Sequence, residues 1–186
     1  MTYASAVAYL YSLQKHGIKL GLETMIALVG RLGMPQARYR TLHIAGTNGK
    51  GSTAAMTAAI LQKAGYRVGL YTSPHLIEFR ELIRVNGEMI GEADVARLTD
   101  VVKGLCDTDI SPTFFECTTA MALQHFADAQ VDVAVLEVGL GGRFDATNVV
   151  TPMACAITTI AMDHQECLGT TLSSVAFAKS GIIKTH

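Results

Sequence analysis

The sequence predicts an α/β domain with a mostly parallel sheet flanked by helices, and two observations support this class. Apolar runs at Val131–Val138 and Met153–Ala161 are bounded by turn residues, and they alternate along the chain with segments of helical periodicity. Apolar runs without a polar face are typical of strands covered on both sides in a parallel sheet. We therefore expect both runs to be buried on both faces, with a ligand site beyond the carboxyl ends of the strands.

The composition suits one compact domain. The chain has 186 residues, of which 49% are hydrophobic and 17% are charged, and its net charge is −1. This charge provides no basic surplus for binding a nucleic acid. A signal peptide and an apolar run of membrane-spanning length are both missing, so we predict a cytoplasmic monomer without nucleic-acid or membrane partners. The cysteines form no close pair and are expected to be reduced and mostly buried: Cys106, Cys117, Cys155 and Cys167.

The other elements follow from periodicity and turn residues. A first helix is expected within residues 2–16, and a second, Glu23–Leu32, must end before Met34-Pro35 because the residue before proline avoids helical angles. Asn86-Gly87, set in the apolar alternation of Leu82–Ile90, predicts a small hairpin insertion. We expect further strands at Arg40–Ala45 and Arg67–Tyr71, and further helices at Ser52–Lys63, Glu92–Gly104, Phe115–Gln130 and Leu172–Lys179.

A glycine-rich loop, HIAGTNGKGS, joins the strand before it to the helix after it. The glycines permit a tight turn, and successive N–H groups and the helix N-terminus can bind phosphate. Lys50 would bridge the β- and γ-phosphates, with a hydroxyl of Ser52 or Thr53 on phosphate or Mg²⁺. The spacing departs from G-x-x-x-x-G-K-[ST], and the alternative is an ordinary glycine turn. We predict an ATP site comprising Gly46, Thr47, Asn48, Gly49, Lys50, Gly51 and Ser52.

Two polar residues are expected where the apolar runs end. Glu137 ends the first run, where an acid beside a phosphate loop is typical of a Mg²⁺ ligand, although it could instead cap a turn or pair with Arg143. Asp163-His164 ends a strand expected at Ala156–Met162. On its own His164 is interpreted as structural or as an acid–base group, since Mg²⁺ prefers oxygen, and Asp163 could orient its ring. His75 follows another strand and lies near the presumed site. Nothing in the residues themselves singles out Lys179.

Five motifs, taken together, resemble the folylpolyglutamate synthase/dihydrofolate synthase family of the Mur ligase superfamily. They are HIAGTNGKGS, YTSPHL followed by IRVNG, PTFFECTTAMA, LEVGLGGRFDATN, and Asp-His-x-x-x-Leu-Gly-x-Thr at residues 163–171. The resemblance spans nearly the whole chain and implies a P-loop NTPase-like Mur-ligase central domain. It also implies ATP-dependent addition of L-glutamate to dihydropteroate or folates, through an acyl phosphate that the glutamate amine attacks. Whether one or both reactions occur stays open.

The resemblance also implies roles for individual residues. Gly49, Lys50, Gly51 and Ser52 match the contacts to the ATP phosphates. Ser73 and Glu137 match a first Mg²⁺ site, His164 matches a ligand of a second, and Lys179 matches a carbamylated lysine, so that Lys50, His164 and Lys179 are the expected catalytic residues. The segments that match pterin-substrate contacts are Leu20-Gly21-Leu22, Thr113-Phe114-Phe115-Glu116 and Phe144-Asp145-Ala146. The two phenylalanine rings could stack on the pterin or belong to the core at a helix start.

The sequence departs from the family pattern in three ways. Ala178 and Ser180 flank the lysine where glutamate and alanine are usual, and Leu82 stands where an arginine is common. Family members are also more than twice as long, so we expect residues 1–186 to be a truncated ATP-binding domain, lacking the C-terminal glutamate-ligase domain and inactive alone. The alternatives are a Mur-type amide ligase, which the Thr-Phe-Phe-Glu and Ser-Pro-His-Leu segments disfavour, and a non-catalytic ATP-binding fragment.

Overall fold

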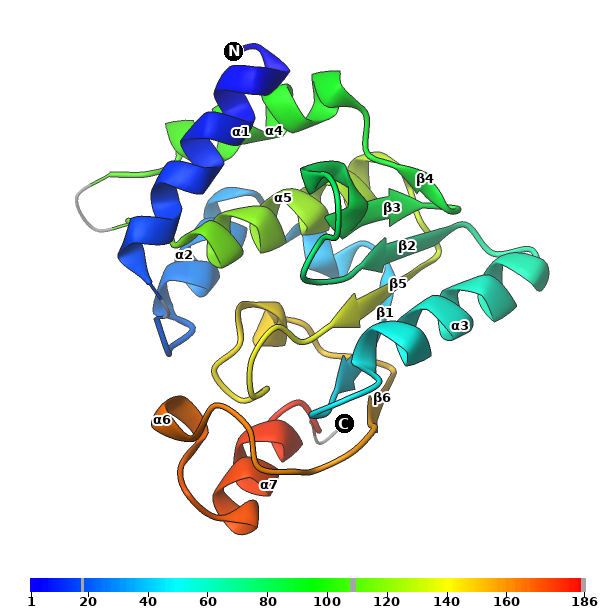
Figure 1. Cartoon of the computed structure of the whole chain (residues 1–186). Coiled ribbons are helices and arrows are strands. Elements are labelled where there is room, and N and C mark those ends of the chain that lie inside the picture. Colours follow the sequence, from blue (N-terminus) through cyan, green and yellow to red (C-terminus); the bar gives the residue numbers. More distant parts are fainter. Residues whose placement is uncertain (18, 108–109, 185–186) are drawn as a thin grey trace.

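A six-stranded mixed sheet with helices on both faces forms the centre of the computed structural model, which describes residues 1–17, 19–107 and 110–184 (Figure 1). The strand order is β4-β3-β2-β5-β1-β6, in which β2, β5, β1 and β6 are parallel and β3 runs antiparallel to both of its neighbours, β2 and β4. The strands are β1 (Arg40–Ala45), β2 (Val68–Tyr71), β3 (Ile83–Val85), β4 (Glu88–Met89), β5 (Val133–Glu137) and β6 (Ala154–Ile157). The predicted α/β class with a mostly parallel sheet is confirmed.

The helices divide between the two faces of the sheet. The α-helices are α1 (Tyr3–Ser12), α2 (Glu23–Arg31), α3 (Lys50–Lys63), α4 (Glu92–Gly104), α5 (Phe114–Asp128), α6 (Gln165–Leu168) and α7 (Leu172–Ser180). Helix α3 covers one face, where Ala54 and Ala58 pack on Ile44, Val68 and Val135. Helices α1, α2, α4 and α5 form the larger core on the other face (Figure 1). None of the described helices is both long and apolar enough to cross a bilayer.

Most of the expected elements are found within two residues of the predicted bounds. The first helix is shorter than expected, because α1 ends at Ser12 and passes into a 3-10 turn at Leu13–His16. The predicted hairpin is confirmed: Asn86 and Gly87 have φ of 50° and 84°, the left-handed angles that a tight hairpin turn requires. These local signals succeed because the turn residues themselves determine the backbone angles.

The second apolar run does not form the expected buried strand. Only Ala154–Ile157 is β-structure, and Ala154, Cys155 and Ala156 are exposed, whereas every residue of β5 is buried. The reason is position, since β5 lies between β1 and β2, while β6 pairs with β1 alone among the described strands. His164 therefore lies seven residues beyond the end of its strand, immediately before α6.

The expectation that the cysteines are mostly buried is also wrong. Cys117 is buried in α5, but Cys155 is exposed on the edge strand, and Cys106 and Cys167 are partly exposed. All four are free thiols, as expected. The failure at Cys155 has the same cause as the failure at β6, because an apolar sequence does not reveal whether a strand lies at the centre or the edge of its sheet.

Candidate active site

The glycine loop lies between β1 and α3, at the carboxyl end of the parallel strands. Gly46 and Gly49 have φ of 147° and 82°, angles that other residues rarely adopt, and Gly49 is the N-cap of α3. Lys50 opens the helix, and its Nζ donates a hydrogen bond to the Thr47 carbonyl at 3.2 Å. The first N–H groups of a helix have no partner within the helix, so this loop presents donors and a cation to one place.

Residues after β6 brace the loop, a function that the sequence did not suggest. The Thr47 N–H donates to the Thr159 carbonyl at 2.8 Å, and the Thr158 hydroxyl donates to the Asn48 carbonyl at 2.7 Å. A Cβ atom at Gly46 would overlap the Thr158 hydroxyl. The available signal was the Thr158-Thr159 pair directly after a strand, where hydroxyl groups can bond to a neighbouring backbone.

Glu137 ends β5 beside this loop and is only 4% exposed. Its Oε2 accepts a hydrogen bond from the Ser73 N–H at 3.1 Å, and a Cβ at Gly51 would lie 3.4 Å from the same oxygen. Burial raises the pKa of Glu137, and the Ser73 N–H and the Lys50 charge oppose that shift only in part. The carboxylate is therefore held close to the phosphate loop in a place where a cation would stabilise it.

Lys179 and His164 approach the loop from the C-terminal helices. Lys179 on α7 is 2% exposed, and its Nζ donates to the Gly46 carbonyl at 2.9 Å. Burial, reinforced by the nearby Lys50 charge, lowers the pKa of Lys179. His164 has a left-handed φ of 41°, and its ring nitrogens are each 3.7 Å from a carboxylate, that of Asp163 on one side and Glu166 on the other.

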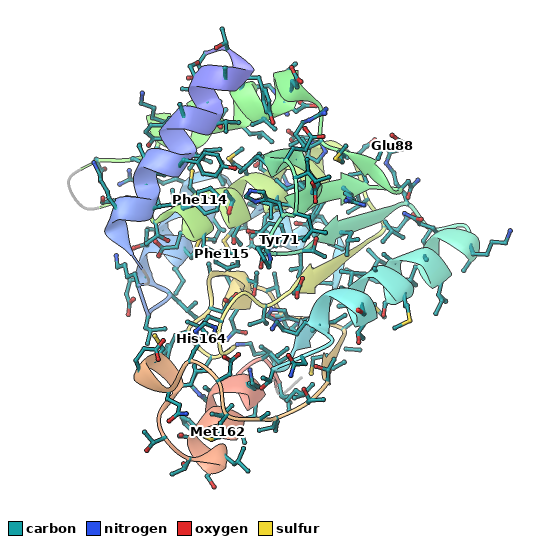
Figure 2. All side chains as sticks on the ribbon, in the orientation of Figure 1. Tyr71, Glu88, Phe114, Phe115, Met162 and His164 are labelled. Carbon is teal, nitrogen blue, oxygen red and sulfur yellow. The ribbon has the colours of Figure 1, made fainter. Side chains whose placement is uncertain are left out.

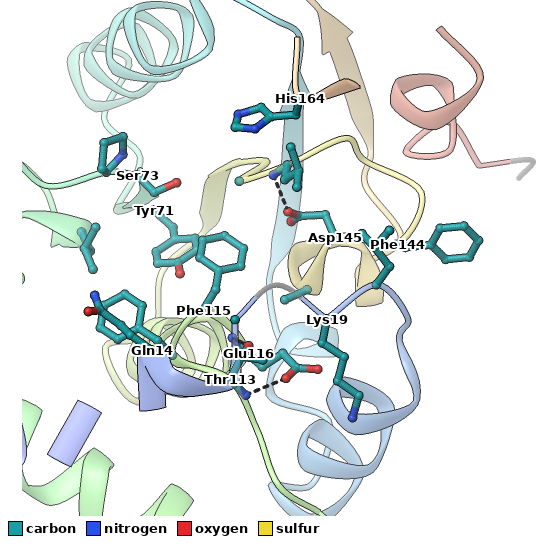
Figure 3. Close-up of a pocket in the computed structure, with 18 of the residues that line it drawn as sticks. Gln14, Lys19, Tyr71, Ser73, Thr113, Phe115, Glu116, Phe144, Asp145 and His164 are labelled. Atoms are coloured by element: carbon teal, nitrogen blue, oxygen red, sulfur yellow. Dashed lines mark hydrogen bonds between the residues drawn. The ribbon is translucent and has the colours of Figure 1, made fainter. Parts of the chain in front are cut away.

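A cavity of about 500 Å³ opens beside the loop (Figure 3). Most of the predicted site residues line it: Leu20, Gly21, Lys50, Ser73, Thr113, Phe114, Phe115, Glu116, Phe144, Asp145, Ala146 and His164. Leu22 is not among the lining residues, and the Phe144 ring points away from the others in Figure 3. Of the phosphate loop, Lys50 alone is among the cavity-lining residues in the described structure. Glu137 and Lys179 do not line the cavity and instead bond to the backbone of Ser73 and Gly46.

Several lining residues were not predicted as site residues from the sequence: Gln14, Gly17, Lys19, Tyr71, Pro74, Leu82, Gly139 and Leu140. His75, which the sequence placed near the site, also lines the cavity. The missed residues come from the 3-10 turn after α1 and the segment that follows it, from β2 with the loop and 3-10 turn after it, and from the loop after β5. They carried no individual signal, because they reach the cavity only through the packing of segments that are distant in the chain.

Aromatic rings form one wall of the cavity. Phe114 stacks on Tyr11 with ring centroids 5.7 Å apart and an interplanar angle of 14°, and the Tyr11 hydroxyl lies 3.0 Å from His75 Nε2. Phe115 lies 5.9 Å from the Tyr71 ring, and a Cβ at Gly139 would overlap it. Tyr71, Phe114 and Phe115 lie together near the middle of the molecule (Figure 2). Both phenylalanines thus line the cavity and also pack against neighbouring aromatic rings.

Two buried carboxylates face the same cavity. Asp145 is 5% exposed and accepts hydrogen bonds from the N–H groups of Leu140 at 2.8 Å and Thr147 at 3.0 Å, while burial raises its pKa. Glu116 is 3% exposed, and its Oε2 accepts from the Thr113 N–H at 2.7 Å. Its Oε1 has no hydrogen-bond partner among the described residues. An apolar, aromatic cavity with a few buried acceptors suits a flat ligand that carries N–H donors.

Comparison with known proteins supports the resemblance inferred from the motifs. The chain is 45% identical to the dihydrofolate synthase/folylpolyglutamate synthase of Bacillus subtilis, an alignment that covers 98% of this chain and 44% of that protein. It is 43% identical to the Escherichia coli protein of the same name, over 98% of this chain and 43% of that one. The chain therefore spans less than half the length of these relatives.

Solved structures give the same result. The structure of E. coli FolC in complex with DHPP and ADP matches with a TM-score of 0.93 and 41% identity, over all of this chain and 45% of that one. The folylpolyglutamate synthase of Thermotoga maritima matches with a TM-score of 0.89 and 48% identity, over 98% of this chain and 42% of that one.

The family profile described as the Mur ligase middle domain matches residues 44–186. Because that match covers most of the sequence, the chain belongs to the Mur ligase family.

Proposed function

We propose that this chain binds ATP at the glycine loop and dihydropteroate or a folate in the adjoining cavity, as part of a ligase that adds L-glutamate to the bound carboxylate. One observation carries the proposal: Lys50 and Ser73, from the phosphate side, line the same cavity as Phe115, Asp145 and Glu116. A phosphate group and a flat acid bound there would be neighbours. The complexes of similar proteins with DHPP and ADP, and with AMPPCP and folate, support both ligands.

The residues around the loop fit a magnesium ion held together with nucleotide. Within the part of the chain that the structure describes, no three His, Cys, Asp or Glu side chains gather as a metal site. Mg²⁺ in nucleotide sites, however, is usually held by one or two protein oxygens plus substrate phosphates. Glu137 and the Ser73 hydroxyl would provide these, with His164 and Lys179 at a second position. The ion would neutralise phosphate charge as phosphoryl transfer proceeds.

Carbamylation would make Lys179 a suitable ligand. The reaction joins the neutral amine to CO₂ and releases a proton, so it requires an unprotonated lysine. Burial and the neighbouring Lys50 charge both favour that neutral form. The product carries oxygen donors and a negative charge in a place where the unmodified amine donates a hydrogen bond to the Gly46 carbonyl.

The proposed chemistry has two steps. The substrate carboxylate attacks the γ-phosphorus, the bond to the β-phosphate oxygen breaks, and an acyl phosphate and ADP result. The glutamate amine then attacks the acyl carbon, the carbon–oxygen bond to phosphate breaks, and an amide, inorganic phosphate and a proton are released. Lys50 would offset the repulsion between the two anions, and the Phe115 and Tyr71 walls would keep water from the acyl phosphate.

Calorimetry tests the proposal on this chain. Dihydropteroate and folate are each titrated into the 186-residue chain with and without Mg·AMPPCP, and the nucleotide is titrated separately. We expect the nucleotide to bind, together with dihydropteroate or folate. Failure to bind either dihydropteroate or folate, or preferential binding of a UDP-muramoyl substrate, would overturn the folate assignment. In any longer protein that contains this chain, glutamate-dependent release of phosphate from Mg·ATP should require dihydropteroate or a folate.

A further inference from the structure

A buried chain of hydrogen bonds connects the middle of the sheet to the cavity. His43 lies on β1 and is fully buried, and its Nε2 is 2.8 Å from the Thr147 hydroxyl. The Thr147 hydroxyl in turn donates a hydrogen bond to Asp145 Oδ1, and Asp145 lines the cavity. Asp145 and Thr147 lie more than 100 residues after His43, so the contact depends on the fold.

The hydrogen atoms in this series of hydrogen bonds can be placed by counting donors. Thr147 has one hydroxyl hydrogen, and because a carboxylate can only accept, that hydrogen goes to Asp145. The hydrogen between Thr147 and His43 must then come from the imidazole, so Nε2 carries it. Nδ1 has no partner among the described residues, and here it holds a lone pair. The opposite arrangement would need a neutral Asp145 and would leave a buried N–H at Nδ1 without an acceptor.

The surroundings favour the same arrangement. Burial lowers the pKa of His43 to about 3, with a smaller contribution from the Lys184 charge, so the ring is neutral. Asp145 also accepts from the backbone N–H groups of Leu140 and Thr147, which are permanent donors. These hydrogen bonds favour the ionised form of Asp145 and oppose the rise in its pKa that burial causes.

We propose that His43 and Thr147 are positioning residues that fix Asp145 as an ionised acceptor for the N–H edge of the heterocycle of the bound substrate. The proposal rests on the proposed function, since the heterocycle is that of dihydropteroate or a folate. The flat ring would lie against Phe115 and present its donors to Asp145. His43 does not itself line the cavity, so its effect on substrate must pass through Thr147.

Substitutions at Thr147 test the link to substrate. Thr147→Val keeps the shape but removes the hydroxyl, and Thr147→Ser keeps the hydroxyl. Thr99→Val is the matched control, because Thr99 is equally buried and its hydroxyl bonds to the Val95 carbonyl within α4. By calorimetry we expect Thr147→Val to bind dihydropteroate about tenfold more weakly than wild type. The other two variants should bind it normally, and Mg·AMPPCP affinity should change by less than about twofold in all three.

His43 provides an independent arm should Thr147→Val fail to fold. His43→Gln can retain a donor near Nε2 and should bind dihydropteroate nearly as wild type, while His43→Leu should resemble Thr147→Val. Nitrogen-15 NMR of the histidine rings should show His43 as a neutral Nε2–H imidazole from pH 5 to 8. An Nδ1–H ring, or titration near pH 6.5, would overturn the assignment whatever the variants do.

The failures of the two proposals are distinguishable. If wild type binds neither dihydropteroate nor folate, the proposed function fails, and the role of His43 in it fails with it. If wild type binds but Thr147→Val and His43→Leu bind equally well, only the positioning role is overturned. Equal weakening of dihydropteroate and nucleotide binding in these variants would indicate general loss of structure and would also contradict the role.

Discussion

The phosphate loop and the adjoining cavity are built in different ways. The loop is one contiguous segment, Gly46–Ser52, whose backbone presents its own N–H groups between β1 and α3. The cavity is assembled from side chains of segments spread from Gln14 to His164. A site made of local backbone is determined by residues near each other in sequence, whereas a site made of converging side chains exists only once the fold has formed.

The two regions also differ in how they are stabilised. Backbone and hydroxyl contacts from Thr158 and Thr159 brace the loop, and the hydroxyl contacts to Asn48 are exposed. The cavity is supported by buried carboxylates and stacked rings, including Asp145, Glu116 and Phe115. Changes near the loop should therefore affect nucleotide binding with little cost in folding, while changes around the cavity should affect substrate binding and stability together.

The largest expected effect is a loss of nucleotide binding at the loop that leaves dihydropteroate binding in the cavity unchanged. Lys50→Ala removes the only lysine of the loop, and a lost charge-assisted bond to phosphate should weaken Mg·AMPPCP binding about 10- to 100-fold. Dihydropteroate affinity and the free energy of unfolding should stay near wild type. Lys63→Ala, at the exposed end of the same helix, is the control in calorimetry. Coupled loss of dihydropteroate binding would contradict the division.

The same difference explains what the sequence could predict. The loop, the hairpin at Asn86-Gly87 and the position of Glu137 at a strand end were predicted, since each depends on neighbouring residues. Many cavity residues were named through the family resemblance, which stands in for the missing three-dimensional information. Tyr71, Gly139 and the Thr158-Thr159 brace were missed, because only the packing of distant segments brings them to the site.

Gly139→Ala should weaken dihydropteroate binding about tenfold and leave nucleotide binding at the loop unchanged. The new Cβ would overlap the Phe115 ring and push it from its place on the wall. Overpacking of this kind costs about 1–3 kcal/mol of unfolding free energy. Gly69→Ala is the matched control, since its Cβ would approach the Phe126 ring to 2.7 Å, away from the cavity.

Both glycine variants should therefore lose similar stability in urea unfolding. Only Gly139→Ala should lose dihydropteroate affinity, and neither should lose Mg·AMPPCP affinity. If Gly69→Ala weakened dihydropteroate binding as much, the effect would come from the shared core and not from the cavity wall.

A smaller effect is expected on the free energy of unfolding when the threonine caps of two helices are replaced. Thr113 caps α5 beside the cavity and accepts from the Glu116 N–H, while Thr171 caps α7 and accepts from the Ser174 N–H. Replacing a threonine cap by alanine costs about 0.5–2 kcal/mol. Thr113 is buried and Thr171 is exposed, so urea unfolding should place Thr113→Ala near the upper end of this range and Thr171→Ala near the lower. Equal costs would show that burial around the cavity adds nothing to the cap.

The smallest expected effect is the pH dependence of the stability contributed by Glu137. Because burial raises the pKa of Glu137, this carboxyl stays protonated to a higher pH in the folded chain than in the unfolded chain, where its pKa is near 4.5. Its contribution to stability without ligand is therefore lost as pH rises from the unfolded value through the folded one. Glu137→Gln cannot lose a proton, so its stability relative to wild type should increase across that interval in urea unfolding.

Nucleotide binding should change in the opposite direction over the same interval. Mg²⁺ requires the ionised carboxylate, so Mg·AMPPCP affinity of wild type should rise with pH while the stability of the free chain falls. Glu81 is the control, because the N–H groups of Leu76, Ile77 and Glu78 lower its pKa. Its stabilisation is present above the unfolded value and is lost as pH falls through the folded one, so Glu81→Gln should reverse the trend in stability. If Glu137→Gln and wild type showed the same pH dependence of nucleotide binding, the metal role of Glu137 would be wrong, and the loop would bind phosphate without it.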